Sequence, residues 1–582
     1  MTVPCLPATM AVAAAIRGMP VADRRTHVSA STPARLAAGW PGSGLVVGPA
    51  VEPGVAAGVR AAGGVPGAPG VVGGNRLAPS DGELARLRRV AIGEEDADLL
   101  VHSGTVVVVQ TGEMLRRDVA IVGRFIAAVT KPGALAGRRS LDASGRYLLP
   151  AFVDAHVRPE RTLLLPGEAA RLLVPRGTVT VLTDPSGLVA RCGPRGAGLA
   201  TATGTPLRVL ARRPGAAGPA AADLLPTERA GAHRTLANLV GYGQLACAVR
   251  AAVVAGMPAA EAVRRATLAP ARRHGLDHVV GSITPAHLAD LLIVSQVGGI
   301  EPPDLVVAGG RIAAGLGKPL FDNPDVVPSW AMDIVRLPAN LHVGSFAAPR
   351  WPGRPAPLPL AVEIVSPLSA PVVPQRQPDL PGLLPGLAVV PGAPAIAPTL
   401  PERVLPEHVL SENPLSERQP TAVLPAGEPS PRYVRVEPTA RDGRLVADPE
   451  RDLLKVALVD RSGGHEPVRV GLVRGVGLTS GAVGVTITEP PGDLLLVGTN
   501  DADMLTAARA LEGMGGGFVV VDRGWVQAAC PLPVAGVVSD APWEAVDGQL
   551  AAADAAAAAI GCRLGNPLQT LADLGTSLHV KP

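Results

Sequence analysis

The sequence is poor in aromatic residues, in lysine and in closely spaced cysteines. Phe, Tyr and Trp together make up 2% of its 582 residues. Because these side chains bury the most area per residue, the core must rest on Leu, Val and Ala. Lys supplies only 4 of the 53 basic residues. In a chain so rich in Ala, Gly and Pro, we attribute the excess of Arg to genome composition and not to a phosphate-binding surface.

What is missing also excludes several classes of function. The formal net charge is +3 and no basic run is present, so nucleic acid is not an expected partner. The five cysteines show no C-x-x-C spacing, which argues against a structural zinc site and a disulfide framework and fits a reducing cytoplasm. No apolar run approaches the roughly 18 residues of a membrane span. The apolar opening lacks the basic segment of a signal peptide, so the expected localisation is cytoplasmic.

Composition divides the chain into five parts. Residues 1–80 are rich in Ala, Gly and Pro without a sustained period, which predicts a disordered extension. Residues 347–432 carry a proline every few positions, so we expect a linker of polyproline II character without central strands. The rest shows strand and helix periodicity. We expect a small β domain over 81–146 and 285–346, a parallel α/β region over 147–284, and a second α/β domain over 433–582.

Several elements follow from periodicity within these parts. Helices are predicted over 83–91, 166–174, 244–255 and 258–266, and later over 502–514 and 543–560. After Pro185 the pattern decays into Gly, Ala, Arg and Pro, so the segment to about Leu236 is predicted to be mostly loop. Strands are predicted over 98–110, 119–122, 124–129, 147–153, 178–184, 288–294, 304–314, 453–459, 494–497 and 518–522.

One strand ends in a pattern that belongs to metal chemistry. Residues 148–160 read LLPAFVDAHVRPE. In a strand, residues i and i+2 point to the same side, so Asp-Ala-His-x-His would direct two imidazoles at one ion. The second position is Arg158, whose guanidinium is always charged and has no lone pair to donate. His156 is therefore the candidate metal ligand, and Glu160 and Asp184 are the candidate catalytic carboxylates.

Motifs in a fixed order identify a family. The chain resembles the adenine deaminases of the amidohydrolase superfamily. This resemblance implies an incomplete TIM-like amidohydrolase barrel with a small β domain, followed by an α/β adenine-deaminase-type C-terminal domain. The motifs are LRRVAIG at 87–93, DLLVHSG at 98–104, DAHV at 154–157, RGTVTVLTDP at 176–185, AVRRATLAP at 262–270, ADL at 289–291, LKVALVDR at 454–461, VGTNDADM at 497–504 and LPVAGVVSD at 532–540.

The resemblance also implies an activity, a cofactor and a substrate. Family members hydrolyse adenine, or a similar purine, to hypoxanthine and ammonia. They use a divalent metal (manganese, iron or zinc) that makes a water nucleophilic near neutral pH, while carboxylates move protons. By this resemblance, His156 occupies the first position of the histidine pair and Glu160 the position of a glutamate just beyond it.

The sequence departs from the family at the ligand positions. Where the family reads Asp-Pro-His-Glu, this chain has Asp184-Pro-Ser-Gly, and where the family reads His-Asp-Ser-His, it has Glu489-Pro-Pro-Gly. None of the 11 histidines is followed two residues later by His or Glu. The other zinc-deaminase type, which needs H-x-E with P-C-x-x-C, is thereby excluded.

Length limits how much of a barrel can form. A (β/α)8 barrel takes about 250 residues, whereas 147–275 has room for about three βα units. An open fragment of parallel sheet leaves an uncovered apolar face, so either a partner chain, such as a second copy, covers it or this half folds poorly. Three functions therefore stay open: an adenine deaminase, an inactive homologue that serves as a binding or assembly module, and a decayed reading frame.

Overall fold

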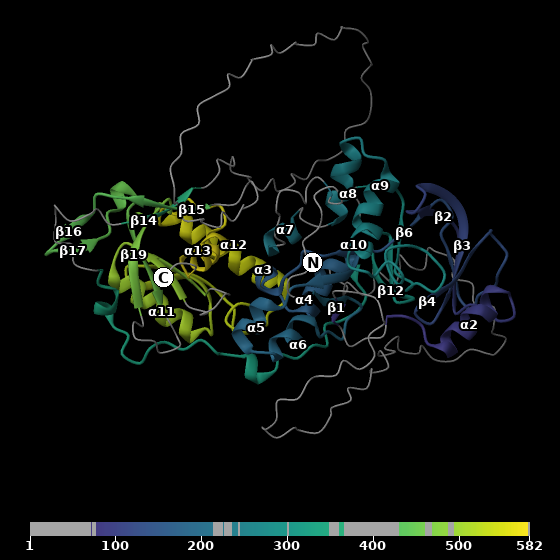
Figure 1. The fold of residues 1–582 in the computed structure, drawn as a ribbon, viewed down its shortest axis with the longest axis horizontal. Helices are drawn as coiled ribbons and strands as arrows, with labels where there is room; N and C mark the ends of the chain where they lie inside the picture. Colours follow the sequence, from purple (N-terminus) through teal and green to yellow (C-terminus); the bar gives the residue numbers. More distant parts are fainter. Residues whose placement is uncertain are drawn as a thin grey trace, which may run out of the picture.

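The computed structural model describes three main β-sheets with helices packed around and between them (Figure 1). The residues described are 71–72, 77–212, 225, 235–241, 245–299, 302–348, 360–365, 430–459, 468–486 and 494–579. Most of the predicted extension 1–80 and of the predicted linker 347–432 lies outside these residues. No helix in these ranges is long and apolar enough to cross a membrane.

A nine-stranded sheet forms the small β domain. Its strands come from two separate stretches of sequence, because β10 pairs with β6 and joins the later strands to the earlier ones. The α2 helix (Asp81–Ala91) covers one side and begins at a capping box between Ser80 and Glu83. The strands are β2 (Leu99–Val108), β3 (Glu113–Val122), β4 (Phe125–Thr130), β5 (Ser140–Asp142), β6 (Tyr147–Pro150), β10 (Leu291–Val294), β11 (Leu305–Ala308), β12 (Arg311–Gly315) and β13 (Lys318–Pro319).

The barrel is represented by a short open sheet and is not closed. Strands β7 (Phe152–Asp154), β8 (Thr178–Thr183) and β9 (Arg208–Arg212) are parallel neighbours, as expected for three βα units. The two-residue strand β1 (Val71–Val72) pairs antiparallel with β9 at one edge. Helices surround the sheet: α3 (Pro159–Thr162), α4 (Pro166–Leu173), α5 (Ser186–Cys192), α6 (Arg195–Thr201), α7 (Leu236–Val240), α8 (Leu245–Val254), α9 (Ala259–Ala266) and α10 (Leu268–Arg273).

The single strand predicted over 147–153 is two strands that belong to different sheets. The chain changes sheet at Ala151, whose N–H donates to the Asp290 carbonyl at 3.0 Å. The next N–H, that of Phe152, donates to the Gly177 carbonyl at 2.9 Å. An unbroken apolar run fits both sheets equally well, so periodicity could not reveal the change of partner.

The prediction of a loop between Pro185 and Leu236 is wrong for residues 186–212. Helices α5 and α6 and strand β9 occupy 186–212, while most of 213–234 lies outside the described residues. The apolar pattern did not predict β9, because this five-residue strand begins and ends with arginine. Arg208 is held by an ion pair to the buried Asp290 at 2.7 Å, and its strand neighbour Leu210 is buried.

An eight-stranded mixed sheet forms the C-terminal unit. It includes β14 (Leu360–Val365) between β15 (Ser430–Arg435) and β19 (Val468–Arg474). This corrects the expectation that the proline-rich segment forms no central strand: Pro359 and Pro367 flank a seven-residue proline-free stretch, residues 360–366. The other elements are β18 (Leu454–Val459), β20 (Ala482–Thr486), β21 (Leu494–Gly498), α11 (Asp501–Gly513), β22 (Gly517–Asp522), β23 (Trp525–Pro531), α12 (Trp543–Ala559) and α13 (Pro567–His579).

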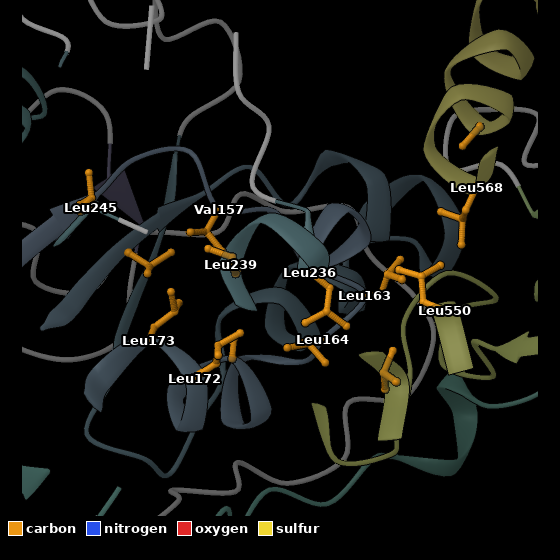
Figure 2. Packing of buried hydrophobic residues seen from close by; sticks show 14 of the residues in the cluster. Val157, Leu163, Leu164, Leu172, Leu173, Leu236, Leu239, Leu245, Leu550 and Leu568 are labelled. Carbon is orange, nitrogen blue, oxygen red and sulfur yellow. The ribbon is translucent and has the colours of Figure 1, made fainter. Parts of the chain in front are cut away.

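The C-terminal unit covers part of the apolar face of the open barrel sheet. In Figure 1, α12 and α13 lie between the C-terminal sheet and helices α3 and α4. Leu163 and Leu164 belong to the same buried cluster as Leu550 and Leu568 (Figure 2). Ion pairs frame the contact: Arg171 to Glu544 at 2.9 Å and Arg161 to Asp573 at 2.7 Å. Part of this face is therefore covered by the same chain.

This contact predicts a large effect of Leu550→Ala. The Leu550 side chain is buried in the cluster that joins the two units, so its truncation should lower the free energy of unfolding by about 2–5 kcal/mol. Urea denaturation followed by circular dichroism measures the change. Leu316→Ala, at a side chain 53% exposed, is the matched control and should change stability by less than about 0.5 kcal/mol. Equal effects of both variants would show that this cluster does not hold the units together.

Candidate active site at the barrel mouth

Three parallel strands end at one edge of the open barrel sheet. β7 ends at Asp154, β8 at Thr183 and β9 at Arg212. Parallel strands bring their carboxyl ends to the same edge, so the residues that follow them lie together. The predicted site residues His156, Glu160 and Asp184 all follow these strand ends, as the sequence suggested. We call this group of side chains the barrel mouth.

An ion pair occupies the centre of the barrel mouth. The Nη2 atom of Arg158 donates to Oδ2 of Asp184 at 2.9 Å. The Ser186 backbone N–H donates to the other carboxylate oxygen at 3.0 Å. Burial alone would raise the pKa of Asp184, but the bonds from Ser186 and the charges of Arg158 and Arg212 outweigh it and lower that pKa below its ordinary value. Asp184 is therefore held as a carboxylate.

Glu160 is in the opposite electrostatic situation. Its side chain is buried, and Oε2 has no hydrogen-bond partner among the described residues. Burial raises the pKa of Glu160, and the nearby negative charge of Asp184 raises it further. Gly187 packs directly on this carboxyl group, since a Cβ there would lie 2.6 Å from Oε1. Buried carboxyl oxygens without partners are uncommon, which marks Glu160 as a functional candidate.

A histidine that the sequence did not single out joins the barrel mouth. His274 follows α10 and is buried, and its Nε2 atom has no hydrogen-bond partner in the described part of the chain. Burial, followed by the charges of Arg212, Arg273 and His156, lowers the pKa of His274 to about 4. His274 lies 118 positions after His156 and carries no local motif, so only the fold could bring it here.

The residues present do not fit the divalent metal that the resemblance implies. Across the ranges that the structure describes, no three His, Cys, Asp or Glu side chains stand close enough to hold an ion. Catalytic zinc sites use three protein ligands. At the second histidine position, Arg158 brings a positive charge that repels a cation, and it engages the carboxylate Asp184. His156 as a metal ligand stays a prediction that this donor set does not support.

Three of the other family motifs have structural roles. Asp290 accepts from Arg208 and from the Gly309 backbone N–H at 2.8 Å, which ties the barrel sheet to the small β domain. In the C-terminal unit, the Asn500 side chain caps α11 by accepting from the Asp503 N–H at 2.8 Å. Lys455, buried in β18, donates to Asp501 and to the Phe346 carbonyl. These motifs therefore mark packing between elements.

Comparison with known proteins agrees with these motifs. The model of the adenine deaminase C-terminal domain matches residues 432–581, and the amidohydrolase family model matches 224–313. An adenine deaminase of Moorella thermoacetica is 30% identical over 585 residues, which cover 87% of this chain and 96% of that relative. The chain belongs to the adenine deaminase family. An adenine deaminase of Halalkalibacterium halodurans is 27% identical, over 84% of this chain and 94% of its own length.

Solved structures show weaker likeness. An adenosine deaminase of Xanthomonas campestris, with bound zinc, is 14% identical and covers 39% of this chain and 95% of its own, at a TM-score of 0.25. A β-aspartyl dipeptidase of Fervidobacterium islandicum is 12% identical at a TM-score of 0.28, over 39% and 99% of the two chains. Scores this low carry no argument. The match to relatives along most of the chain makes the protein an adenine deaminase-like amidohydrolase and does not favour the alternatives of a binding module or a decayed reading frame.

Because Arg158 prevents a pair of histidine ligands, the change Arg158→His should increase the affinity of the barrel mouth for a divalent metal. This change removes the repelling charge and creates a histidine pair with His156, so the variant should retain more zinc or manganese than the unmodified protein. Metal content after gel filtration, measured by mass spectrometry, tests this. Arg161→His is the matched control, because it adds a histidine without completing the pair. A full equivalent of metal on the unmodified protein would contradict the misfit.

The environment of His274 predicts a dependence of stability on pH. The pKa of His274 is about 4 in the folded chain, against about 6.5 when unfolded. Between these values the unfolded chain binds the extra proton, so the free energy of unfolding should fall as pH decreases from 6.5 to 4, by roughly 1 kcal/mol per pH unit. Urea titrations at several pH values measure this slope. His274→Gln should flatten it, whereas His342→Gln, at an exposed side chain, should not; equal slopes in both would refute the assignment.

Proposed function

We propose that this chain hydrolyses adenine, or a closely related purine, at the barrel mouth. Membership in the family implies a purine substrate. The observation that carries the proposal is the pairing of two carboxyl groups whose surroundings shift their pKa values in opposite directions, Glu160 upward and Asp184 downward. Such a pair supplies a proton donor and a proton acceptor at the same pH. Glu160 and Asp184 are also the two carboxylates that the sequence offered as catalytic candidates.

The reaction can be written with the chain's own groups. The Asp184 carboxylate takes a proton from water as the water oxygen bonds to C6 of the purine, and the electron pair of the C6=N1 double bond moves to N1. The protonated Glu160 carboxyl gives its proton to the amino nitrogen as the bond between C6 and that nitrogen breaks. The N1 electron pair then re-forms the double bond to C6, and ammonia leaves. The proton on Asp184 returns to Glu160 through solvent, and the hydroxyl proton of the product moves to N1, so that adenine and water become hypoxanthine and ammonia. Arg158 and Ser186 orient the carboxylate through their bonds to Asp184.

The rate should be low for two physical reasons. A bound divalent metal would lower the pKa of water from 15.7 to about 7, and the residues present do not fit such an ion, so water must be activated by a base alone. That base, Asp184, has a pKa below its ordinary value because of the Ser186 bonds and the Arg158 and Arg212 charges, which limits its proton affinity. Slow turnover without dependence on added metal is therefore the expected behaviour.

Hypoxanthine formation from adenine, followed by chromatography over hours, tests the proposal. Asp184→Asn and Glu160→Gln should each lower the rate by about 10²- to 10⁴-fold, because each removes one proton transfer. Asp573→Asn, at an ion pair outside the barrel mouth, is the control and should keep the rate. Chelator should leave the unmodified protein's rate unchanged. Absence of hypoxanthine with and without manganese, iron or zinc would refute the proposal, as would full activity of both variants.

A further inference from the structure

A cavity lies at the end of α5 that is farther from the barrel mouth. The α5 helix begins at Ser186, next to Asp184, and ends at Cys192, which lines this cavity. Its volume is about 640 Å³, within the range of roughly 300–1,000 Å³ that small-molecule sites occupy. The start of α6 and the segment around 330–336 form its other walls. The barrel mouth and this cavity are therefore separated by the length of one short helix.

Three arginines line this cavity, and no acidic side chain does so among the described residues. Most arginines elsewhere in the barrel region are paired: Arg158, Arg161, Arg171 and Arg208 each hold a carboxylate. In contrast, the structure gives Arg195 and Arg336 no carboxylate partner within the residues that it describes. Unpaired guanidinium groups that converge on a cavity attract an anion and can bind phosphate through two nitrogens.

The third arginine is fixed in place by the C-terminal unit. Arg191 is 6% exposed, and its Nε donates to the Ala535 carbonyl at 2.7 Å. Gly536 makes room for it: a Cβ at this position would lie 2.4 Å from Nη2 of Arg191. The chain therefore holds one guanidinium rigidly at the wall while two exposed ones stand nearby.

An aromatic ring completes the cavity. Trp330 is 39% exposed, in a chain that has only five tryptophans. The guanidinium of Arg195 lies over its ring, 5.9 Å from the centroid. An exposed indole is a platform on which a flat base can stack, with about 1–3 kcal/mol per stacked base in nucleic-acid complexes. Cationic groups beside an aromatic platform match a ligand that has both a phosphate and a planar ring.

We propose that this cavity binds a nucleoside phosphate, with the phosphate on Arg191, Arg195 and Arg336 and the base against Trp330. The site is separate from the barrel mouth and goes beyond the proposed deamination. Inorganic phosphate shares the anion chemistry and lacks the ring, whereas adenosine has the ring and lacks the charge. Comparing AMP with inorganic phosphate and with adenosine therefore tests the arginines and the Trp330 ring separately.

Calorimetric titration of the full chain with AMP, adenosine and inorganic phosphate tests this proposal. AMP should bind more tightly than either other probe. Arg336→Ala and Trp330→Leu should each weaken AMP binding by about tenfold or more, because they remove the anion partner and the stacking surface respectively. Arg523→Ala, at an exposed arginine of the C-terminal unit outside the cavity, is the matched control and should leave AMP affinity unchanged.

Three outcomes would overturn the proposal. AMP and phosphate of equal affinity would remove the role of the ring, and AMP affinity unchanged in both variants would place the nucleotide elsewhere. Weaker AMP binding in Asp184→Asn would assign it to the barrel mouth. Circular dichroism of each variant confirms that it is folded. The deamination assay is independent of this measurement, so either proposal can fail alone.

Discussion

The ion pair between Arg158 and Asp184 is the interaction on which the barrel mouth depends. Asp154 and Asp184 lie at or just beyond the same ends of the parallel strands, where carboxylates would repel one another without positive charge, and the Asp184 charge also raises the pKa of the nearby Glu160. In a metal-dependent amidohydrolase, divalent ions supply that charge. Here Arg158 and Arg212 supply it, and together with the hydrogen bonds from Ser186, which contribute more, they lower the pKa of Asp184 despite its burial. Unlike a metal ion, the guanidinium of Arg158 is covalently attached to the chain and needs no ligands to hold it. The electrostatic role of the metal-ligand positions is therefore absent here.

The shortened barrel and the altered mouth are physically connected. A closed barrel surrounds its mouth with eight strand ends, which can contribute ligands from several directions. Three strand ends offer fewer directions, and the α12 and α13 helices of the C-terminal unit pack over part of the space left free. Leu163 and Leu164 beside the barrel sheet are buried in the same cluster as Leu550 of α12. The same chain thus covers part of an open sheet for which chain length left two alternatives, a partner chain or poor folding.

The sequence predicted those features that depend on local pattern. The helix at 83–91 and the strands at 98–110, 124–129 and 178–184 follow from apolar spacing and turn residues, and the structure confirms them within a few residues, whereas the third parallel strand β9 was predicted as loop. It could not predict the change of sheet at Ala151, because both sheets accept an apolar strand. Nor could it predict β14, since the many prolines on both sides made the whole segment look like a linker, although the six residues of β14 contain no proline. His274 is invisible for a different reason: only tertiary packing of α10 against the barrel sheet brings it towards His156.

The position of α5 explains how one short helix can serve two chemically different surfaces. At its beginning, Gly187 leaves space only for the Glu160 carboxyl, and the Ser186 N–H binds Asp184. At its end, Arg191 is locked to the Ala535 carbonyl of the C-terminal unit. A helix that is held at both ends changes little in length, because its backbone hydrogen bonds fix the rise per residue. The α5 helix is therefore fixed to the barrel mouth at its beginning and to the C-terminal unit at its end.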